Sequence, residues 1–359
     1  MNAGPRRRSR QARARLRRTI AVAVAALAAL ALAATAIVVA ARRPVSAHHQ
    51  PNGATATVPP AHAPATSSPQ VAMSVTATLA GWKLPVPLSR SVVEMGDGGK
   101  LLVLGGLTSN DRTVATITEI DPATGSSRPV AQLAKAAHDA AGALIGGDAF
   151  VFGGGGATEL ATVQRWAPGT PAAAAAGALP TTRSDLVTVQ SGGQVYLVGG
   201  YDGRRPVANV LRTTDGTTFT TVSVLPEAVR YPAVAMLGTT LYVIGGQSAS
   251  GETNAIQAVD ITTGSARVVV RMPAPISHAA AVTIDGAVYV LGGRRAGAAL
   301  DEMARFDATT GALTAVGRLP LALSDAGVAT AGDTAYLIGG EAATQLTSVV
   351  EVRGGPPNP

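Results

Sequence analysis

The chain has 359 residues, of which 47% are hydrophobic and 3% aromatic, with 41 glycines and 23 prolines. This composition is typical of many short strands joined by tight turns. Cysteine is absent, which excludes a disulfide scaffold and a thiolate metal site. Ten of the 29 basic residues lie in the first 43 residues, which contain no acid, so the rest carries 19 basic and 22 acidic residues. The formal charge of +7 therefore does not indicate nucleic-acid binding, and we expect no nucleic-acid partner.

The N-terminal segment predicts a membrane anchor. Residues 1–18 form a basic tail with eight arginines, and residues 19–41 contain no charged residue. As a helix, this apolar run would span roughly 33 Å, which matches the hydrocarbon core of a bilayer. The excess of arginines before the span places the tail in the cytoplasm and the rest of a single-pass protein outside the cell membrane. The alternative is a signal peptide cleaved after Ala47, although signal peptides usually have apolar runs of only about 7–15 residues.

The rest of the chain divides by composition and repetition. Residues 42–70 are rich in Pro, Ala and Thr and predict an extended linker, residues 71–353 form a repeat domain, and residues 354–359 form a short tail. In the repeat domain, an apolar strand ending in a glycine pair recurs six times at intervals of 46 to 48 residues. The six copies are LLVLGG (101–106), AFVFGG (149–154), VYLVGG (195–200), LYVIGG (241–246), VYVLGG (288–293) and AYLIGG (335–340). This period indicates the blades of a β-propeller.

Each repeat reads as four antiparallel strands, and the repeats predict how the ring closes. In the fifth unit the strands are expected at 278–284, 287–293, 302–311 (the third strand with its turn) and 312–320. After the last glycine pair, the sequence offers only a third strand at 347–353. We therefore expect an N-terminal strand at about 71–79 to complete the last blade and to cover its open edge.

The glycine pairs, together with Asp-x-x-Thr-Gly turns at 121–125, 260–264 and 307–311, resemble the kelch repeat. The glycine pair is present in all six units, whereas most of the aromatic positions usual in kelch blades hold other residues. The resemblance covers 71–353 and implies an all-β, six-bladed kelch-type propeller closed by the N-terminal strand. Kelch propellers serve mostly as binding platforms, and some are enzymes.

Loops that lead into the inner strands, and loops that follow the second strands, are expected at one mouth of the central channel. Counting back 16 residues from each second glycine gives Arg90, His138, Ser184, Arg230, Ser277 and Ser324, and the next residues are Ser91, Asp139, Asp185, Tyr231, His278 and Asp325. Arg294 and Glu341 directly follow glycine pairs. From these positions we predict a ligand-binding collar of Arg90, His138, Asp139, Asp185, Arg230, Tyr231, His278, Arg294, Asp325 and Glu341. Such a mixture suits a protein or a polar glycan, because arginine offers a planar fork of donors to carboxylates.

The leading hypothesis is a membrane-tethered binding or scaffolding module outside the cytoplasm, without a metal or another cofactor. His138 and His278 fall in opposite blades, so joint metal ligation would need a narrow channel. Sequence motifs of serine hydrolases (GxSxG) and zinc proteases (HExxH) are absent. The alternative is a mutarotase similar to the bacterial envelope kelch propellers that act on sialic acid, with Glu341, His138 and Asp139 as candidate acid and base groups.

Overall fold

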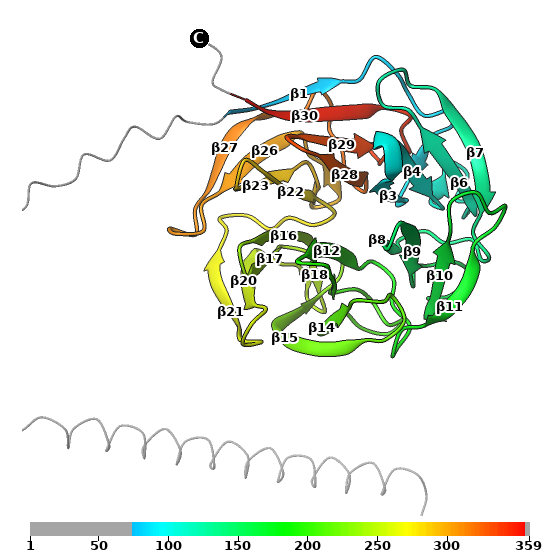
Figure 1. Ribbon diagram of the computed structural model, residues 1–359. Helices are drawn as coiled ribbons and strands as arrows, with labels where there is room; N and C mark the ends of the chain where they lie inside the picture. Colours follow the sequence, from blue (N-terminus) through cyan, green and yellow to red (C-terminus); the bar gives the residue numbers. More distant parts are fainter. Residues whose placement is uncertain (1–73, 356–359) are drawn as a thin grey trace, which may run out of the picture. The chain divides into compact units, whose positions relative to one another are not determined.

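The computed structural model describes residues 74–355, and the expected tail, membrane span and linker at 1–18, 19–41 and 42–70 lie outside this range. Residues 74–355 form six four-stranded antiparallel sheets, which surround a central axis as the blades of a β-propeller (Figure 1). The prediction of an all-β, six-bladed propeller is therefore confirmed. Within these residues, no helix has the length and apolar character needed to cross a membrane.

In blades 1 to 5 the strands follow one another from the axis outward, and blade 6 differs in its outermost strand. Blades 1 to 3 comprise β3 (Val92–Met95), β4 (Leu101–Leu104), β6 (Thr116–Ile120), β7 (Ser127–Gln132); β8 (Ala141–Ile145), β9 (Asp148–Phe152), β10 (Thr162–Trp166), β11 (Ala174–Ala178); and β12 (Val187–Ser191), β13 (Gln194–Val198), β14 (Val207–Thr213), β15 (Thr220–Val229). Blades 4 to 6 comprise β16 (Ala233–Leu237), β17 (Thr240–Ile244), β20 (Ala255–Asp260), β21 (Ala266–Arg271); β22 (Ala280–Ile284), β23 (Ala287–Leu291), β26 (Glu302–Phe306), β27 (Leu313–Arg318); and β28 (Gly327–Ala331), β29 (Thr334–Ile338), β30 (Val349–Gly355), β1 (Ser74–Leu79). Short pairs and one 3-10 turn complete the ring: β2 (Leu88–Ser89) with β5 (Leu107–Thr108), β18 (Gln247–Ser248) with β19 (Gly251–Glu252), β24 (Arg294–Arg295) with β25 (Ala298–Ala299), and η1 (Asp97–Gly99).

The hydrophobic core is divided among the six interfaces between neighbouring blades. Each interface holds its own cluster of buried side chains; Leu101 of blade 1, for example, packs in one cluster with Ile338 of blade 6. The other clusters join blades 1 and 2, 2 and 3, 3 and 4, 4 and 5, and 5 and 6. Second strands such as β4 and β23 are buried throughout, whereas outer strands such as β11 and β27 are mostly exposed. Each blade therefore depends on both neighbours for its burial.

The glycine pairs join each blade to the next through the backbone. In all six cases the N–H of the second glycine donates, at 2.8–2.9 Å, to a carbonyl of the segment that leads into the next blade; Gly106, for example, donates to Ala137. The first glycine has a positive φ and approaches the same carbonyl so closely that a Cβ at Gly105 would lie 2.3 Å from the Ala137 oxygen. Glycine is therefore required here both by the left-handed backbone and by the close approach.

The expected closure of the ring is confirmed. Strand β1 pairs antiparallel with β30, in a register that runs from Ser74 opposite Gly355 to Leu79 opposite Val350. The two strands lie side by side at the outer edge of blade 6 (Figure 1). Val75 is buried in the cluster shared by blades 5 and 6. The N-terminal strand thus covers the edge that β30 would otherwise expose.

Candidate functional site

The mouth of the channel is built on six residues, one from each blade, that form a closed circuit of backbone hydrogen bonds. The N–H of each residue donates to the carbonyl of its counterpart in the preceding blade, at 2.8–3.2 Å, and blade 1 completes the circuit by donating to blade 6. All six have φ between 51° and 58°, which is uncommon for residues with a side chain. We call this set the inner ring: Arg90, Asp139, Asp185, Tyr231, His278 and Asp325.

The inner ring corrects the register expected for blade 1. Arg90 was expected beside His138 and Ser184, but it is the counterpart of Asp139 and Asp185. Ser89 takes the position expected for Arg90, because it pairs with Leu107 as Ser184 pairs with Tyr201. The cause is the turn between β3 and β4, where three residues, Asp97–Gly99, lie between the hydrogen-bonded Gly96 and Lys100. The equivalent turn of blade 2 has only Gly146 and Gly147.

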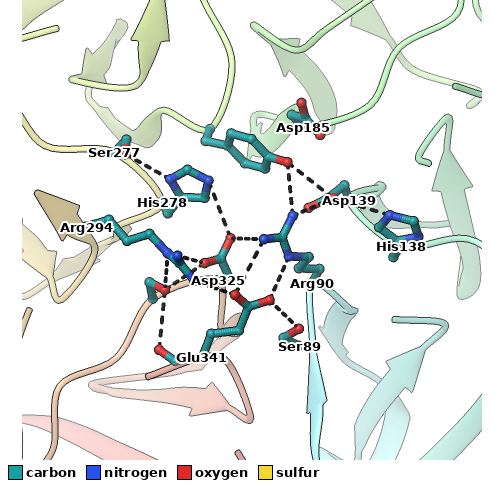
Figure 2. Close-up of polar contacts among 12 residues, drawn as sticks. Ser89, Arg90, His138, Asp139, Asp185, Ser277, His278, Arg294, Asp325 and Glu341 are labelled. Carbon is teal, nitrogen blue, oxygen red and sulfur yellow. Dashed lines mark hydrogen bonds and ion pairs between the residues drawn. The ribbon is translucent and has the colours of Figure 1, made fainter. Parts of the chain in front are cut away.

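The Arg90 guanidinium lies at the centre of the mouth (Figure 2). Its Nε donates to Glu341 Oε1 at 2.8 Å, and its Nη1 donates to Asp139 Oδ2 at 3.0 Å and to the Tyr231 hydroxyl at 3.1 Å. Its Nη2 lies 3.8 Å from Asp325 Oδ1. Blades 1 and 4 are opposite each other in a ring of six, so the bond between Arg90 and Tyr231 crosses the channel axis.

A second arginine, Arg294, completes an acidic cluster on the side of blades 5, 6 and 1. Its Nε donates to Asp325 Oδ2 at 3.1 Å and to the Ser324 hydroxyl at 2.9 Å, and its Nη2 donates to Glu341 Oε2. The Ser89 hydroxyl donates to Glu341 Oε1 at 2.8 Å. Glu341 is thus held by two arginines and a serine, and both of its oxygens are occupied.

Arg230 lies on the other side of the mouth and is less tightly paired. Its Nη1 is 3.4 Å from Asp185 Oδ2, and its Nε donates to Gln247 Oε1 at 3.2 Å. The guanidinium carbon lies 4.9 Å from the centre of the Tyr201 ring and 5.3 Å from that of Tyr231, which are cation–π distances. The side chain is 34% exposed, compared with 20% for Arg90 and 22% for Arg294. Arg230 is therefore the most exposed of the three collar arginines.

The two collar histidines lie on opposite sides of Arg90 (Figure 2). His138 Nδ1 hydrogen-bonds the Thr113 hydroxyl at 2.9 Å, and its Nε2 is 3.6 Å from Asp139 Oδ2. The His278 ring stacks on Tyr231 with centres 3.9 Å apart, and its Nδ1 is 2.8 Å from the Ser277 hydroxyl. Among residues 74–355, no group of three or more carboxylate and imidazole side chains is placed to hold a metal ion.

Burial and charge set the protonation of the collar. Burial alone would raise the pKa of Glu341, but the hydrogen bond and charge of Arg90 hold that pKa below its usual value. Burial, with help from the nearby Asp139 carboxylate, raises the pKa of Asp185 to about 7. Burial, together with the charges of Arg90 and Arg294, lowers the pKa of His278 to about 3, so this ring is neutral at physiological pH. Glu341, which remains an anion, and Asp185, which titrates near neutral pH, thus both lie at the mouth of the channel.

The collar residues expected from the sequence do come together, but they largely satisfy one another. Sequence reasoning missed Ser89, because the longer first turn shifted the register. Tyr201 follows a glycine pair and was expected near the mouth, but it was left out of the predicted collar, although it supports Arg230. Sequence reasoning also missed Glu94 on the inner strand β3. The available signal was an acidic residue at a position that is alanine or valine in the other five inner strands.

Comparisons with known proteins agree with the architecture. No family model matches the chain. Over 80 residues, which are 22% of this chain, the sequence is 40% identical to mouse (Mus musculus) Kelch-like protein 35, and the match spans 14% of that protein's length. The solved structure titled "Structure of YjhT" superposes with a TM-score of 0.66 at 16% identity, covering 76% of this chain and 99% of the other. The propeller topology and these likenesses together support a β-propeller of the kelch type.

Proposed function

We propose that this kelch-type β-propeller is a binding module that holds an anionic group of a protein or glycan ligand on Arg230 at the mouth of its channel. The observation that carries the proposal is the geometry of this arginine: its side chain is the most exposed of the three collar arginines, and its guanidinium lies against the rings of Tyr201 and Tyr231. A guanidinium offers two parallel donors to a carboxylate. A side chain that is already held in position before the ligand arrives loses less conformational entropy on binding.

Arg90 and Arg294 have a different role in this proposal. Both are committed to Asp325 and Glu341, so they fix the shape of the mouth rather than contact the ligand. Charge reversal at either one would add a carboxylate to an already acidic cluster and would disturb the fold. Arg230 is therefore the site for a clean test.

Replacement of Arg230 by glutamine is expected to weaken ligand binding about tenfold or more, because a hydrogen bond to a charged group contributes roughly 1.5–3 kcal/mol. The measurement is retention of proteins and acidic glycans from the cell-envelope fraction on immobilised full-length protein. The matched control is Arg267→Gln on the outer strand β21, where the arginine is exposed away from the mouth. If the Arg230 variant and the wild type retain the same ligands equally, Arg230 is not the recognition residue.

The second candidate function is an enzyme of the mutarotase type, and Asp185 is the observation that favours it. Of the acid and base groups expected from the sequence, Glu341 is fixed as an anion by two arginines. Asp185 lies beside Arg230, and its pKa near 7 suits general acid–base catalysis at neutral pH. An acidic sugar held by Arg230 would place its ring close to this carboxyl group.

For this second function, we expect Asp185→Asn to abolish exchange between the anomers of an acidic sugar while leaving its association with the mouth in place. Anomer exchange is measured by NMR saturation transfer on N-acetylneuraminic acid, with Asp148→Asn, whose carboxylate pairs with Arg165 in blade 2, as the control. If the wild-type protein leaves the exchange rate unchanged, the enzyme hypothesis fails and the binding hypothesis is unaffected.

The proposed module is tethered to the cell membrane by residues 19–41, with the propeller outside the cytoplasm. The support is the sequence alone: an uncharged run of 23 residues preceded by eight arginines. In this arrangement the linker at 42–70 lets the mouth reach ligands at some distance from the bilayer.

A further inference from the structure

The central channel continues beneath the inner ring, between the six inner strands. A cavity of about 190 Å³ lies directly under the ring, and a second cavity of about 450 Å³ lies toward the opposite end of the channel. Val93, Glu94 and Val328 line both cavities, so the two meet at this level. Because Arg90 and Tyr231 bond across the axis at the mouth, we expect entry from the opposite face.

Glu94 is the one titratable residue of the inner strands β3, β8, β12, β16, β22 and β28. The register of each inner strand with its second strand identifies its counterparts, which are Ala143, Val189, Ala235, Val282 and Ala329. A carboxyl group thus occupies a level of the channel at which every other blade presents an apolar side chain.

Glu94 is not part of the ion-pair network at the mouth. The structure gives its carboxylate no hydrogen bond and no ion pair with any residue in 74–355, and the nearby Arg90 is committed to Asp139 and Glu341. The carboxylate lies against the backbone of β8, where a Cβ on Gly142 would be 3.0 Å from its Oε1. Although the channel keeps the side chain partly accessible, burial within the ring raises the pKa of Glu94 to about 8. Because a carboxylate buried without a partner is costly, Glu94 is mostly protonated at neutral pH, and a bound cation would stabilise its charged form.

The walls of the second cavity define the rest of the ligand. They are mostly valine, alanine, leucine and methionine side chains, with Gln190, Thr283 and Thr330 as the neutral polar groups. Polar atoms, including the carboxyl group of Glu94, nevertheless form much of the exposed wall. A cavity with a few convergent polar groups is typical of small-molecule sites. We propose that this end of the channel binds a small organic amine, whose ammonium group pairs with Glu94. The site is separate from the mouth and takes a ligand of opposite charge.

The proposal is tested on the full-length protein with three probes that share one ring and differ in the head group: benzylamine, benzyl alcohol and benzoate. Isothermal titration calorimetry is expected to show saturable binding of benzylamine that is at least about tenfold tighter than that of the other two. Glu94→Gln is expected to weaken benzylamine binding by about the same factor, and Thr330→Trp at the far opening is expected to block it.

Two control variants separate this site from the rest of the molecule. Glu119→Gln removes an exposed carboxylate of blade 1, which is paired with Arg128, and is expected to leave benzylamine binding unchanged. Arg230→Gln is expected to leave it unchanged as well, so the failure of one site would not imply the failure of the other. The proposal is overturned if wild-type protein does not bind benzylamine saturably, if it binds benzyl alcohol equally well, or if Glu94→Gln binds the amine as wild type does.

Discussion

Deletion of residues 71–79, which contain β1, is expected to lower the melting temperature of the whole propeller by about 10 °C or more. The deletion removes the ladder between β1 and β30 and the burial of Val75, which together contribute about 5 kcal/mol. Since every blade shares its core with both neighbours, the loss in blade 6 is expected to destabilise the entire ring in one transition. Thermal unfolding followed by circular dichroism measures the effect.

Two point variants on β1 separate strand pairing from a simple loss of residues. Val75→Asp places a carboxylate in the cluster between blades 5 and 6, whereas Thr76→Asp places the same group on the exposed face of the strand. Only the first is expected to lower the melting temperature strongly, because an unpaired buried charge is costly. An unchanged melting curve for both Val75→Asp and the deletion would show that β1 does not close the ring in solution.

Replacement of Arg90 by methionine is expected to destabilise the propeller by about 3–5 kcal/mol at neutral pH, which corresponds to a melting temperature lower by about 10 °C. The guanidinium is largely buried between Asp139, Asp325 and Glu341. Methionine fills similar space but leaves these carboxylates without their central cation. Removing one partner of a buried ion pair costs far more than the pair itself contributes, because the remaining charge stays buried.

The pH dependence of this variant gives a more specific test. In the wild type, Arg90 lowers the pKa of Glu341, so the resulting stabilisation is present above the unfolded pKa and is lost as the pH falls through the folded value. Without Arg90 the carboxylates take up protons more readily, so the deficit relative to wild type is expected to shrink as the pH is lowered from 7 toward 4.5, the ordinary pKa of a glutamate. Arg128→Met, which breaks an exposed pair with Glu119, is expected to have little effect at either pH. A deficit independent of pH would contradict the role given to the charge of Arg90.

The sequence was sufficient for the architecture because each blade repeats the same backbone requirement. A pair such as Gly105 and Gly106 is needed wherever a second strand ends against the next blade, and this requirement makes the repeat visible. The sequence also predicts closure by β1, because the last repeat has only three of the four strands that the other repeats have. Neither inference needed knowledge of which side chains meet.

The sequence predicts which residues form the site, but it does not predict which of them contact one another. That Arg90 would bond Tyr231 across the axis depends on the width of the ring, which no local pattern encodes. The shift of register at Ser89 comes from one extra residue in the turn between β3 and β4. Both the longer and the shorter turn contain glycines, so the sequence does not reveal the extra residue. Glu94 lies inside an inner strand, and an acid at this position is a departure from the repeat that can be seen in the sequence alone.

In the inner ring, the backbone groups join the blades and the side chains face the proposed ligand. Its circuit is made by backbone N–H and carbonyl groups, so the six positions hold Arg, Asp, Asp, Tyr, His and Asp without any change in how the blades are joined. The backbone circuit requires of each position only a left-handed backbone, so side chains outside the ion pairs of Arg90 are open to selection for recognition. The same scaffold can therefore acquire a different specificity by substitutions at its mouth, one blade at a time, while its closure stays intact.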